Sequence, residues 1–321
     1  MKRYAAIHVK RRFASLFRDE RGNVMVLVAA SMVFLIGVLG LVIDLGKVYV
    51  KKSDLKKEAT TAVLSASQEL VDYEGTTVEE DKQRVRNIVL DILRSYEDEA
   101  SLEEDGTGIE LELNHYVTVR LREKVPFSFM SLFGFEGVTV HEEASAVIKT
   151  LSGLTGVVPL GIDESIELNY GEITTLKVGA GDSDTGNFGA LALAGRGDKT
   201  FMETLKYGYT EPLSVGDTIQ TEPGNMSGTS DVISYRISQC PDADLHERGC
   251  PRIVPIVVYA GDLGGRSDLT VKGFAFFYLL EPIDDKTIRG KFIRYVENGT
   301  YGGAGADKGA YTTRLVEQVT Q

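Results

Sequence analysis

The chain has 321 residues, of which 35 are Lys or Arg and 47 are Asp or Glu, and its net charge is −12. Hydrophobic residues make up 43% of it, which excludes both a disordered chain and a protein of many membrane spans. Two cysteines and four histidines leave little material for a metal centre, and 34 glycines indicate many turns. The length is sufficient for about two domains.

Residues 1–21 form a basic arm, and the uncharged run from Val24 to Ile43 follows it. At ~1.5 Å per residue this run reaches across the ~30 Å hydrocarbon core of a bilayer. A basic arm by itself fits nucleic acid or anionic lipid, but the apolar run behind it favours the lipid bilayer over nucleic acid. We therefore predict a transmembrane helix over 22–44, with a buried helix of a soluble domain as the alternative.

The run is longer than the ~7–15 apolar residues of a secretory signal, and no A-x-A-like cleavage site follows it, so we expect a permanent anchor. Seven basic residues precede the run and five follow it closely. The positive-inside rule then places the arm 1–21 in the cytoplasm. The expectation is a single-pass protein of the cell membrane with an extracytoplasmic C-terminal domain.

Residues 45–72 continue as a predicted stalk helix, because small and apolar residues recur there at helical spacing. The stripe contains Leu55, Ala59, Ala62 and Ala66. Such a stripe packs against the protein's own domain or against a partner helix, and the second possibility includes a homo-oligomer through the stalk. Glu58 is expected to lie off the stripe.

Residues 73–150 are predicted to be an α+β segment. An acidic block carries apolar residues at helical spacing, and a solvated helix face is favoured there over a calcium site. Period-two alternation from Ile109 to Leu121 then predicts half-buried strands. Between this region and a strand over 138–148, three aromatic residues are expected to fill a core, or to form an interaction patch if exposed: Phe127, Phe129 and Phe133.

Residues 151–297 predict a β-rich ectodomain, because Gly-, Thr- and Asp-rich segments separate short apolar runs. The glycine-rich residues 298–321 predict a flexible tail. The fold class expected for the whole chain is α+β: one N-terminal transmembrane helix that continues into a stalk, followed by a mostly β ectodomain.

Cys240 and Cys250 are close in sequence, and each is followed by proline. Outside the cytoplasm such a pair most simply forms a disulfide, with free thiols or a metal site that includes His246 as alternatives. Closing so short a loop contributes roughly 2–3 kcal/mol. Loss of this link is expected to act locally and to leave the stalk helix unaffected.

Two blocks of the sequence resemble the TadG-like proteins of the Tad/Flp (tight adherence) pilus apparatus. The first has a glycine before the apolar run, Asp44-Leu-Gly just after it, Tyr49, and the alanine-rich helix from Leu55 to Ala66. The second runs from Val117 through Pro126-Phe-Ser-Phe129 to the alternating alanines that end at Ala146. Families of this type usually have Asp where Thr60 stands. A prepilin-like cut after Gly22 is not expected, because Leu27 occupies the position usually held by Glu.

The resemblance implies a membrane-anchored structural component of Tad/Flp pilus assembly whose ectodomain contacts pilus or apparatus proteins, with no enzyme activity, cofactor or metal. Its expected helix-contact residues are Asp44 and the stalk stripe. The alternative is a membrane-anchored extracellular binding module for a small ligand, cation or polysaccharide. A surface hydrolase has little support, because His115 and His141 have no recognisable nucleophile motif near them.

Overall fold

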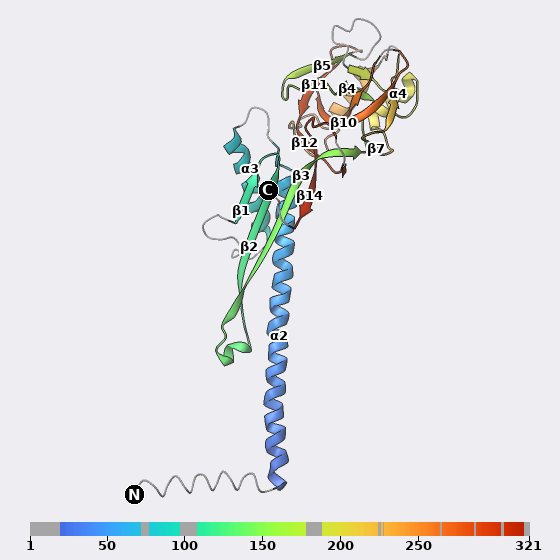
Figure 1. Cartoon of the computed structure of the whole chain (residues 1–321). Coiled ribbons are helices and arrows are strands. Elements are labelled where there is room, and N and C mark those ends of the chain that lie inside the picture. Colours follow the sequence, from blue (N-terminus) through green and yellow to red (C-terminus); the bar gives the residue numbers. More distant parts are fainter. Residues whose placement is uncertain are drawn as a thin grey trace, which may run out of the picture. The chain divides into compact units, whose positions relative to one another are not determined.

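The computed structural model describes residues 20–71, 77–96, 108–177, 188–223, 226, 228–263, 265–285, 287–302 and 305–317, and for residues 20–23 the backbone alone. A long N-terminal helix is followed by a mostly β region, so the α+β class is confirmed (Figure 1). The chain forms two compact units. Among the described residues, the first unit contains 20–57 and 121–142, and the second contains the remainder.

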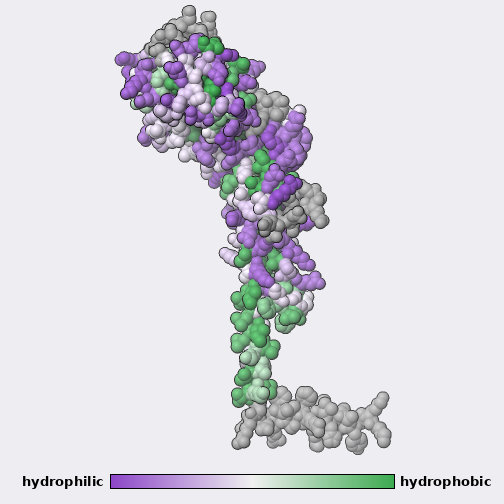
Figure 2. Space-filling view, turned by 180° about the vertical axis from the view of Figure 1, so that it is seen from behind, coloured by the Kyte–Doolittle hydropathy of each residue, from purple (hydrophilic) through white to green (hydrophobic). Residues whose placement is uncertain are grey.

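Helix α2 runs without interruption from Glu20 to Ser67. In the described part of the chain it is the one helix long and apolar enough to cross a membrane, and a signal sequence near an N-terminus would have the same character. Almost all side chains from Val24 to Ile43 are exposed, and Figure 2 shows one face of the helix as a hydrophobic surface. A soluble fold would cover such a surface, so its exposure calls for another apolar environment.

Helix α3 (Val78–Ser95) occupies the acidic block. It begins with a capping box, in which the Thr77 hydroxyl accepts the Glu80 amide at 3.2 Å and the Glu80 carboxylate accepts the Thr77 amide at 2.9 Å. Val85, Val89 and Leu93 are buried on one face. Exposed charged residues, among them Glu79 and Asp91, form the solvated helix face that the sequence predicts.

The first sheet is ordered β1-β2-β3-β14-β12, and β7 and β13 also pair with β3. Its strands are β1 (Ile109–Glu112), β2 (Tyr116–Pro126), β3 (Gly137–Leu154), β7 (Leu213–Ser214), β12 (Tyr295–Val296), β13 (Thr300–Tyr301) and β14 (Ala310–Val316). The 3₁₀ helix η1 (Met130–Phe133) lies in the connection between β2 and β3.

Strand β14 corrects the expectation of a flexible tail over 298–321. It pairs antiparallel with β3, from Tyr311 opposite Thr150 to Val316 opposite Ser145, and parallel with β12. Strand β3 pairs with residues 311–316 and β12 with Ala310 and Tyr311, so hydrogen bonds to these strands hold the segment in place. The glycines before it supply turns, and Gly309 has a φ of +78° that favours glycine.

The second sheet is ordered β5-β11-β10-β9-β4-β6, with β8 on β10. Its strands are β4 (Leu160–Asp163), β5 (Ile173–Lys177), β6 (Phe188–Ala190), β8 (Thr218–Gln220), β9 (Ile253–Ala260), β10 (Asp268–Leu279) and β11 (Thr287–Ile293). All of its ladders are antiparallel except that between β4 and β9.

The central strands β9 and β10 are buried on both faces, which explains their continuous apolar runs. One core contains Val254 and Phe277, together with residues of helices α4 (Asp198–Tyr207) and α5 (Thr229–Ser238). The opposite core contains Val257 and Phe276, together with residues of β3 and β12. The sequence does not predict these two helices, because each has only ten residues within a glycine-rich region of short apolar runs.

Candidate functional site

Asp44, in α2, is bonded to the tip of the hairpin formed by β2 and β3. Its carboxylate accepts three backbone amides: Ser128 at 2.8 Å, Phe129 at 2.9 Å and Met130 at 2.7 Å. Asp44 is only 1% exposed. These amides lie at the start of η1, where backbone N–H groups have no partner within the helix, so a carboxylate both satisfies them and complements their dipoles.

Further contacts hold the same hairpin along α2. A Cβ built at Gly40 would lie 2.6 Å from the Cβ of Phe129. The absence of a side chain at Gly40 therefore lets Phe129 pack against the backbone of α2. One turn beyond Asp44, the Lys47 ammonium donates to the Ser128 hydroxyl. Farther along α2, Lys51 pairs with Glu123 at 2.9 Å and Lys52 with Glu142 at 3.5 Å.

The aromatic side chains of the hairpin tip do not fill a core. Phe127 is half-buried, whereas Phe129 is 37% exposed and Phe133 is 66% exposed. Leu132 and Phe135 are also exposed, at 80% and 56%. The expectation of a core plug is therefore wrong for Phe133, and the alternative of an apolar interaction patch describes the tip.

The stalk stripe is covered by the protein's own fold. Leu55, Ala59, Ala62 and Ala66 are all fully buried, so a second copy would have to displace existing packing to reach them. Glu58 is also buried, at 5% exposure, which contradicts the expectation that it lies off the packed face. Helix position alone did not predict this, because the buried surface of α2 here is wider than one stripe.

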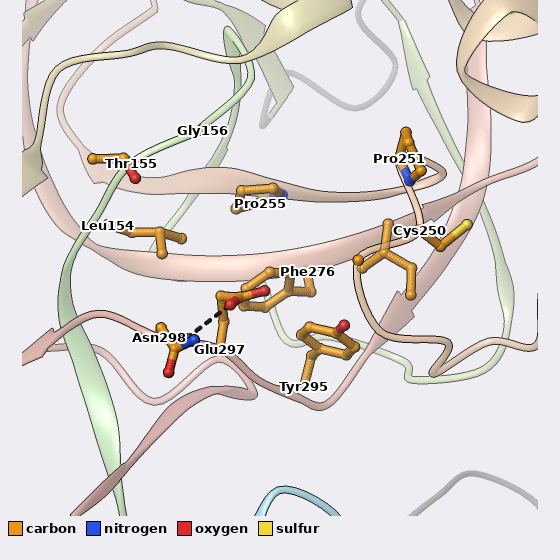
Figure 3. Close-up of a pocket in the computed structure, with 12 residues that line it drawn as sticks. Leu154, Thr155, Gly156, Cys250, Pro251, Pro255, Phe276, Tyr295, Glu297 and Asn298 are labelled. Carbon is orange, nitrogen blue, oxygen red and sulfur yellow. Dashed lines mark hydrogen bonds between the residues drawn. The ribbon is translucent and has the colours of Figure 1, made fainter. Parts of the chain in front are cut away.

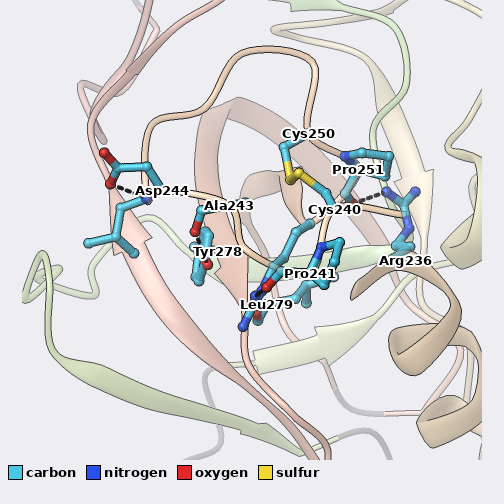
Figure 4. The surroundings of a disulfide bond; sticks show 11 residues. Arg236, Cys240, Pro241, Ala243, Asp244, Cys250, Pro251, Tyr278 and Leu279 are labelled. Carbon is cyan, nitrogen blue, oxygen red and sulfur yellow. Dashed lines mark hydrogen bonds between the residues drawn. A yellow bond between two sulfur atoms is a disulfide. The ribbon is translucent and has the colours of Figure 1, made fainter. Parts of the chain in front are cut away.

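A disulfide joins Cys240 and Cys250, with 5.8 Å between their Cα atoms (Figure 4). Backbone acceptors around the loop receive three side chains: Tyr278 donates to Ala243 at 2.8 Å, Arg252 to Pro241 at 3.0 Å, and Arg236 to Pro251 at 2.7 Å. Burial lowers the pKa of Arg236 to about 10, which leaves it charged at neutral pH. These bonds hold the loop against β10 and α5.

The disulfide loop also contacts the end of α2. Arg248 donates to the backbone carbonyl of Gln68 at 2.6 Å and to that of Val296 at 3.0 Å, and it lies 3.6 Å from the Glu69 carboxylate. Burial, together with the positive charge of Arg84, lowers the pKa of His246, in the same loop, to about 4. The loop of the disulfide is thus attached to the turn that ends the stalk, a contact that the sequence does not predict.

A cavity of about 390 Å³ lies beside this disulfide, between the end of β3, the segment from Gly249 to Pro255 and the segment from Tyr295 to Asn298 (Figure 3). The rings of Phe276 and Tyr295, 4.9 Å apart, form part of its wall. The Glu297 carboxylate, another lining group, accepts a hydrogen bond from the backbone N–H of Asn298 at 2.9 Å.

No group of three or more His, Cys, Asp or Glu side chains in the described ranges is arranged to hold a metal ion. The calcium alternative for the acidic block extends over residues 72–76 and 97–107, which lie outside the described residues. His115 bonds the Glu112 carboxylate at 3.3 Å, and His141 is exposed on β3.

No family model, curated protein or solved structure matches the chain. The description of the site therefore depends on the structure of this chain alone.

The sequence predicts Asp44 as a contact residue but does not predict its partner, the hairpin tip. The sequence does mark the tip itself, although not its bond to Asp44, because Val125 to Phe135 carries no charge while the strands on either side are highly charged.

Proposed function

We propose that the protein is a membrane-anchored structural component of a Tad/Flp-type pilus apparatus. The observation that carries this proposal is the bond between Asp44 and the hairpin tip. It joins the two sequence blocks that resemble TadG-like proteins, Asp44-Leu-Gly and Pro126-Phe-Ser-Phe129. In this proposal the apolar part of α2 crosses the membrane once, residues 1–21 are cytoplasmic, and residues 45–321 are extracytoplasmic, where they contact pilus or apparatus proteins.

Two features support this topology, the first the membrane anchor and the second the extracytoplasmic side. The exposed apolar surface of α2 requires a non-aqueous environment, which a bilayer supplies. The disulfide is of the kind that persists in oxidising compartments, and the described chain contains no free cysteine. Both features are expected of a domain held outside the membrane by one helix.

Protease treatment tests the topology. Protease added to intact spheroplasts of the native host should digest the C-terminal domain, while a cytoplasmic marker protein stays intact. Digestion that occurs only after permeabilisation would show that the C-terminal domain is cytoplasmic and that the proposed orientation is wrong. Recovery of a soluble, full-length protein in the periplasm would contradict the membrane anchor.

Deletion and crosslinking test the pilus role separately. Deleting the gene should abolish surface pili and adherence, and the wild-type gene supplied in trans should restore both. Crosslinking with mass spectrometry should identify pilus or apparatus proteins linked to the ectodomain. If deletion leaves piliation and adherence unchanged, the pilus role fails even where the topology holds.

The cavity near the disulfide favours a second candidate, an anchored module that binds a small ligand. Its aromatic wall and the Glu297 carboxylate fit a sugar or a small cation. A thermal-shift screen of sugars and cations against the purified protein tests this role. A ligand that raises the melting temperature of the wild type should not raise that of Glu297→Gln. If no compound shifts the melting temperature, the ligand-binding role loses its support and the structural role is the remaining candidate.

A further inference from the structure

We propose that the tip of the β2–β3 hairpin, residues 127–136, inserts its apolar side chains into the surface of the bilayer that α2 crosses. This inference rests on the proposed membrane anchor. The occupant of the exposed patch is then lipid: the acyl chains and glycerol region of the outer leaflet.

The first argument is depth. Gly40 lies within the uncharged run that ends at Ile43, and Phe129 packs directly against it. Asp44, the first charged residue after the run, holds the backbone of the tip. Because the contacts fall at the last turn of the apolar run, an α2 that spans the bilayer places the tip at its surface, about one helical turn (~5 Å) deep.

The second argument is the direction of the charged contacts. They begin with Lys47 and continue at Lys51 and Lys52, each farther along α2 from the apolar run. Their partners on the hairpin stand correspondingly farther from its tip. The hairpin is therefore apolar at the membrane end of α2 and charged at the end that faces water, as a membrane interface requires.

The third argument is the composition of the tip. The segment from Val125 to Phe135 has no charged residue, and the exposed side chains at its end are large and apolar. Figure 2 shows the hydrophobic surface of α2, and the exposed apolar residues of the tip are Phe129, Leu132, Phe133 and Phe135. Glu136, where charge returns, pairs with Lys124 at 3.5 Å.

The fourth argument is that seven backbone amides of the tip have hydrogen-bond acceptors within the protein. Entry into lipid is costly for an unpaired amide. Asp44 accepts three amides, and carbonyls of the same hairpin accept others: those of Phe127, Leu132, Gly134 and Phe135. The two serine hydroxyls are also bonded, Ser131 to the Ser128 carbonyl at 2.8 Å and Ser128 to Lys47. The tip can therefore enter the interface without exposing these groups to hydrocarbon.

The chain has no tryptophan, so a single introduced tryptophan reports its own surroundings without background. We would place it at Phe133 (F133W) in the full-length protein, reconstituted in phosphatidylcholine–phosphatidylglycerol vesicles with the ectodomain outside. Leu39→Trp, in the apolar run, is the control for the span, and Ile283→Trp, exposed in the second unit, is the control for water. Leu132→Trp repeats the test should F133W fold poorly.

Lipids brominated at different acyl-chain depths are the probe. We expect them to quench F133W, most strongly when the bromines are shallow, with emission shifted to the blue relative to I283W. L39W, in the same last part of the apolar run, should also be quenched by bromolipid, and I283W should respond to aqueous iodide alone.

Quenching of F133W by iodide and not by bromolipid, with L39W still quenched, would overturn the inference and leave the anchor intact. Protection of F133W from both quenchers would also overturn it, because a second copy or another protein segment would then cover the tip. If L39W too is untouched by bromolipid, the membrane anchor itself fails, and the inference fails with it.

Discussion

The Asp44 carboxylate accepts the backbone amide of Met130 at 2.7 Å, although 86 sequence positions separate the two residues. The same carboxylate takes the amides of Ser128 and Phe129. One side chain thus replaces the partners that the start of η1 lacks. Because the bonds are charge-assisted and shielded from water, they fix the hairpin tip to the residue that follows the apolar run.

Replacing Asp44 by alanine should release the tip. The three amides would lose their acceptor, and their hydrogen exchange should accelerate by roughly tenfold or more. Exchange measured by mass spectrometry on the protein in nanodiscs gives the comparison. Asp54→Ala removes an exposed carboxylate from the same helix and should leave exchange at 128–130 unchanged. Equal protection in Asp44→Ala and wild type would show that the carboxylate does not hold the tip.

Gly40 and Gly37 form a matched pair for the packing of Phe129. A methyl group at Gly40 would lie 2.6 Å from the Phe129 Cβ, whereas one at Gly37 would meet nothing within 4 Å. Gly40→Ala should therefore displace the tip and speed exchange of its amides, while Gly37→Ala should behave as wild type. The contact loses its support if the two variants give the same exchange profile.

Charge placed in the buried stripe should destabilise the protein. Ala62→Glu and Ala66→Glu each bury a carboxylate without a partner, at an expected cost of about 3 kcal/mol or more in unfolding free energy. Ser53→Glu, at an exposed position of α2, is the control and should have little effect. Urea unfolding of the three variants measures the difference. Unchanged midpoints for Ala62→Glu and Ala66→Glu would mean that the stripe is not packed.

Acid should destabilise the second unit through His246. The pKa of His246 is lowered from 6.5 to about 4 in the folded protein, by burial and by Arg84, against the opposing effect of Asp244 and Asp81. The unfolded state therefore binds more protons between these values. Stability is fully present above about pH 6.5 and falls towards pH 4, by up to about 3 kcal/mol.

Thermal unfolding of wild type and His246→Gln across this range checks the sign. The wild type should lose melting temperature as the pH falls from 6.5 to 4, and the variant should lose less. If the variant is as acid-sensitive as the wild type, the loss of stability at low pH comes from carboxylates and not from His246. Glu110 is one such group, because its bond from Tyr116 lowers its pKa and makes its contribution fade at lower pH.

Removing the disulfide should loosen the end of the stalk as well as the loop. The double variant Cys240→Ser, Cys250→Ser should lose roughly 2–3 kcal/mol and expose the turn at Gln68 and Glu69 to faster hydrogen exchange. Arg248→Ala should reproduce the faster exchange while keeping the disulfide, and Arg266→Ala, at an exposed position, should not. Unchanged exchange at this turn in the double variant would support the local role that the sequence predicts.

The sequence by itself determined the features that depend on neighbouring residues. The uncharged run and the stripe of small residues predict the long helix α2, and alternation predicts the strands near Ile109 and Val117. The spacing and flanking residues of Cys240 and Cys250 pointed to their bond. In each case the information lies within a few residues, where backbone geometry sets the period of the pattern.

Tertiary structure alone decided which distant segments meet. Nothing near Asp44 shows that its partner is the backbone of residues 128–130, because backbone amides have no sequence signature. The glycine-rich C-terminal segment looked flexible, yet β3 and β12 supply the hydrogen bonds that make its residues 310–316 a strand. Arg248 likewise contacts the end of α2 by a hydrogen bond to the backbone carbonyl of Gln68. Long-range bonds to backbone groups are invisible in side-chain patterns, and for that reason the fold, and not the sequence, revealed them.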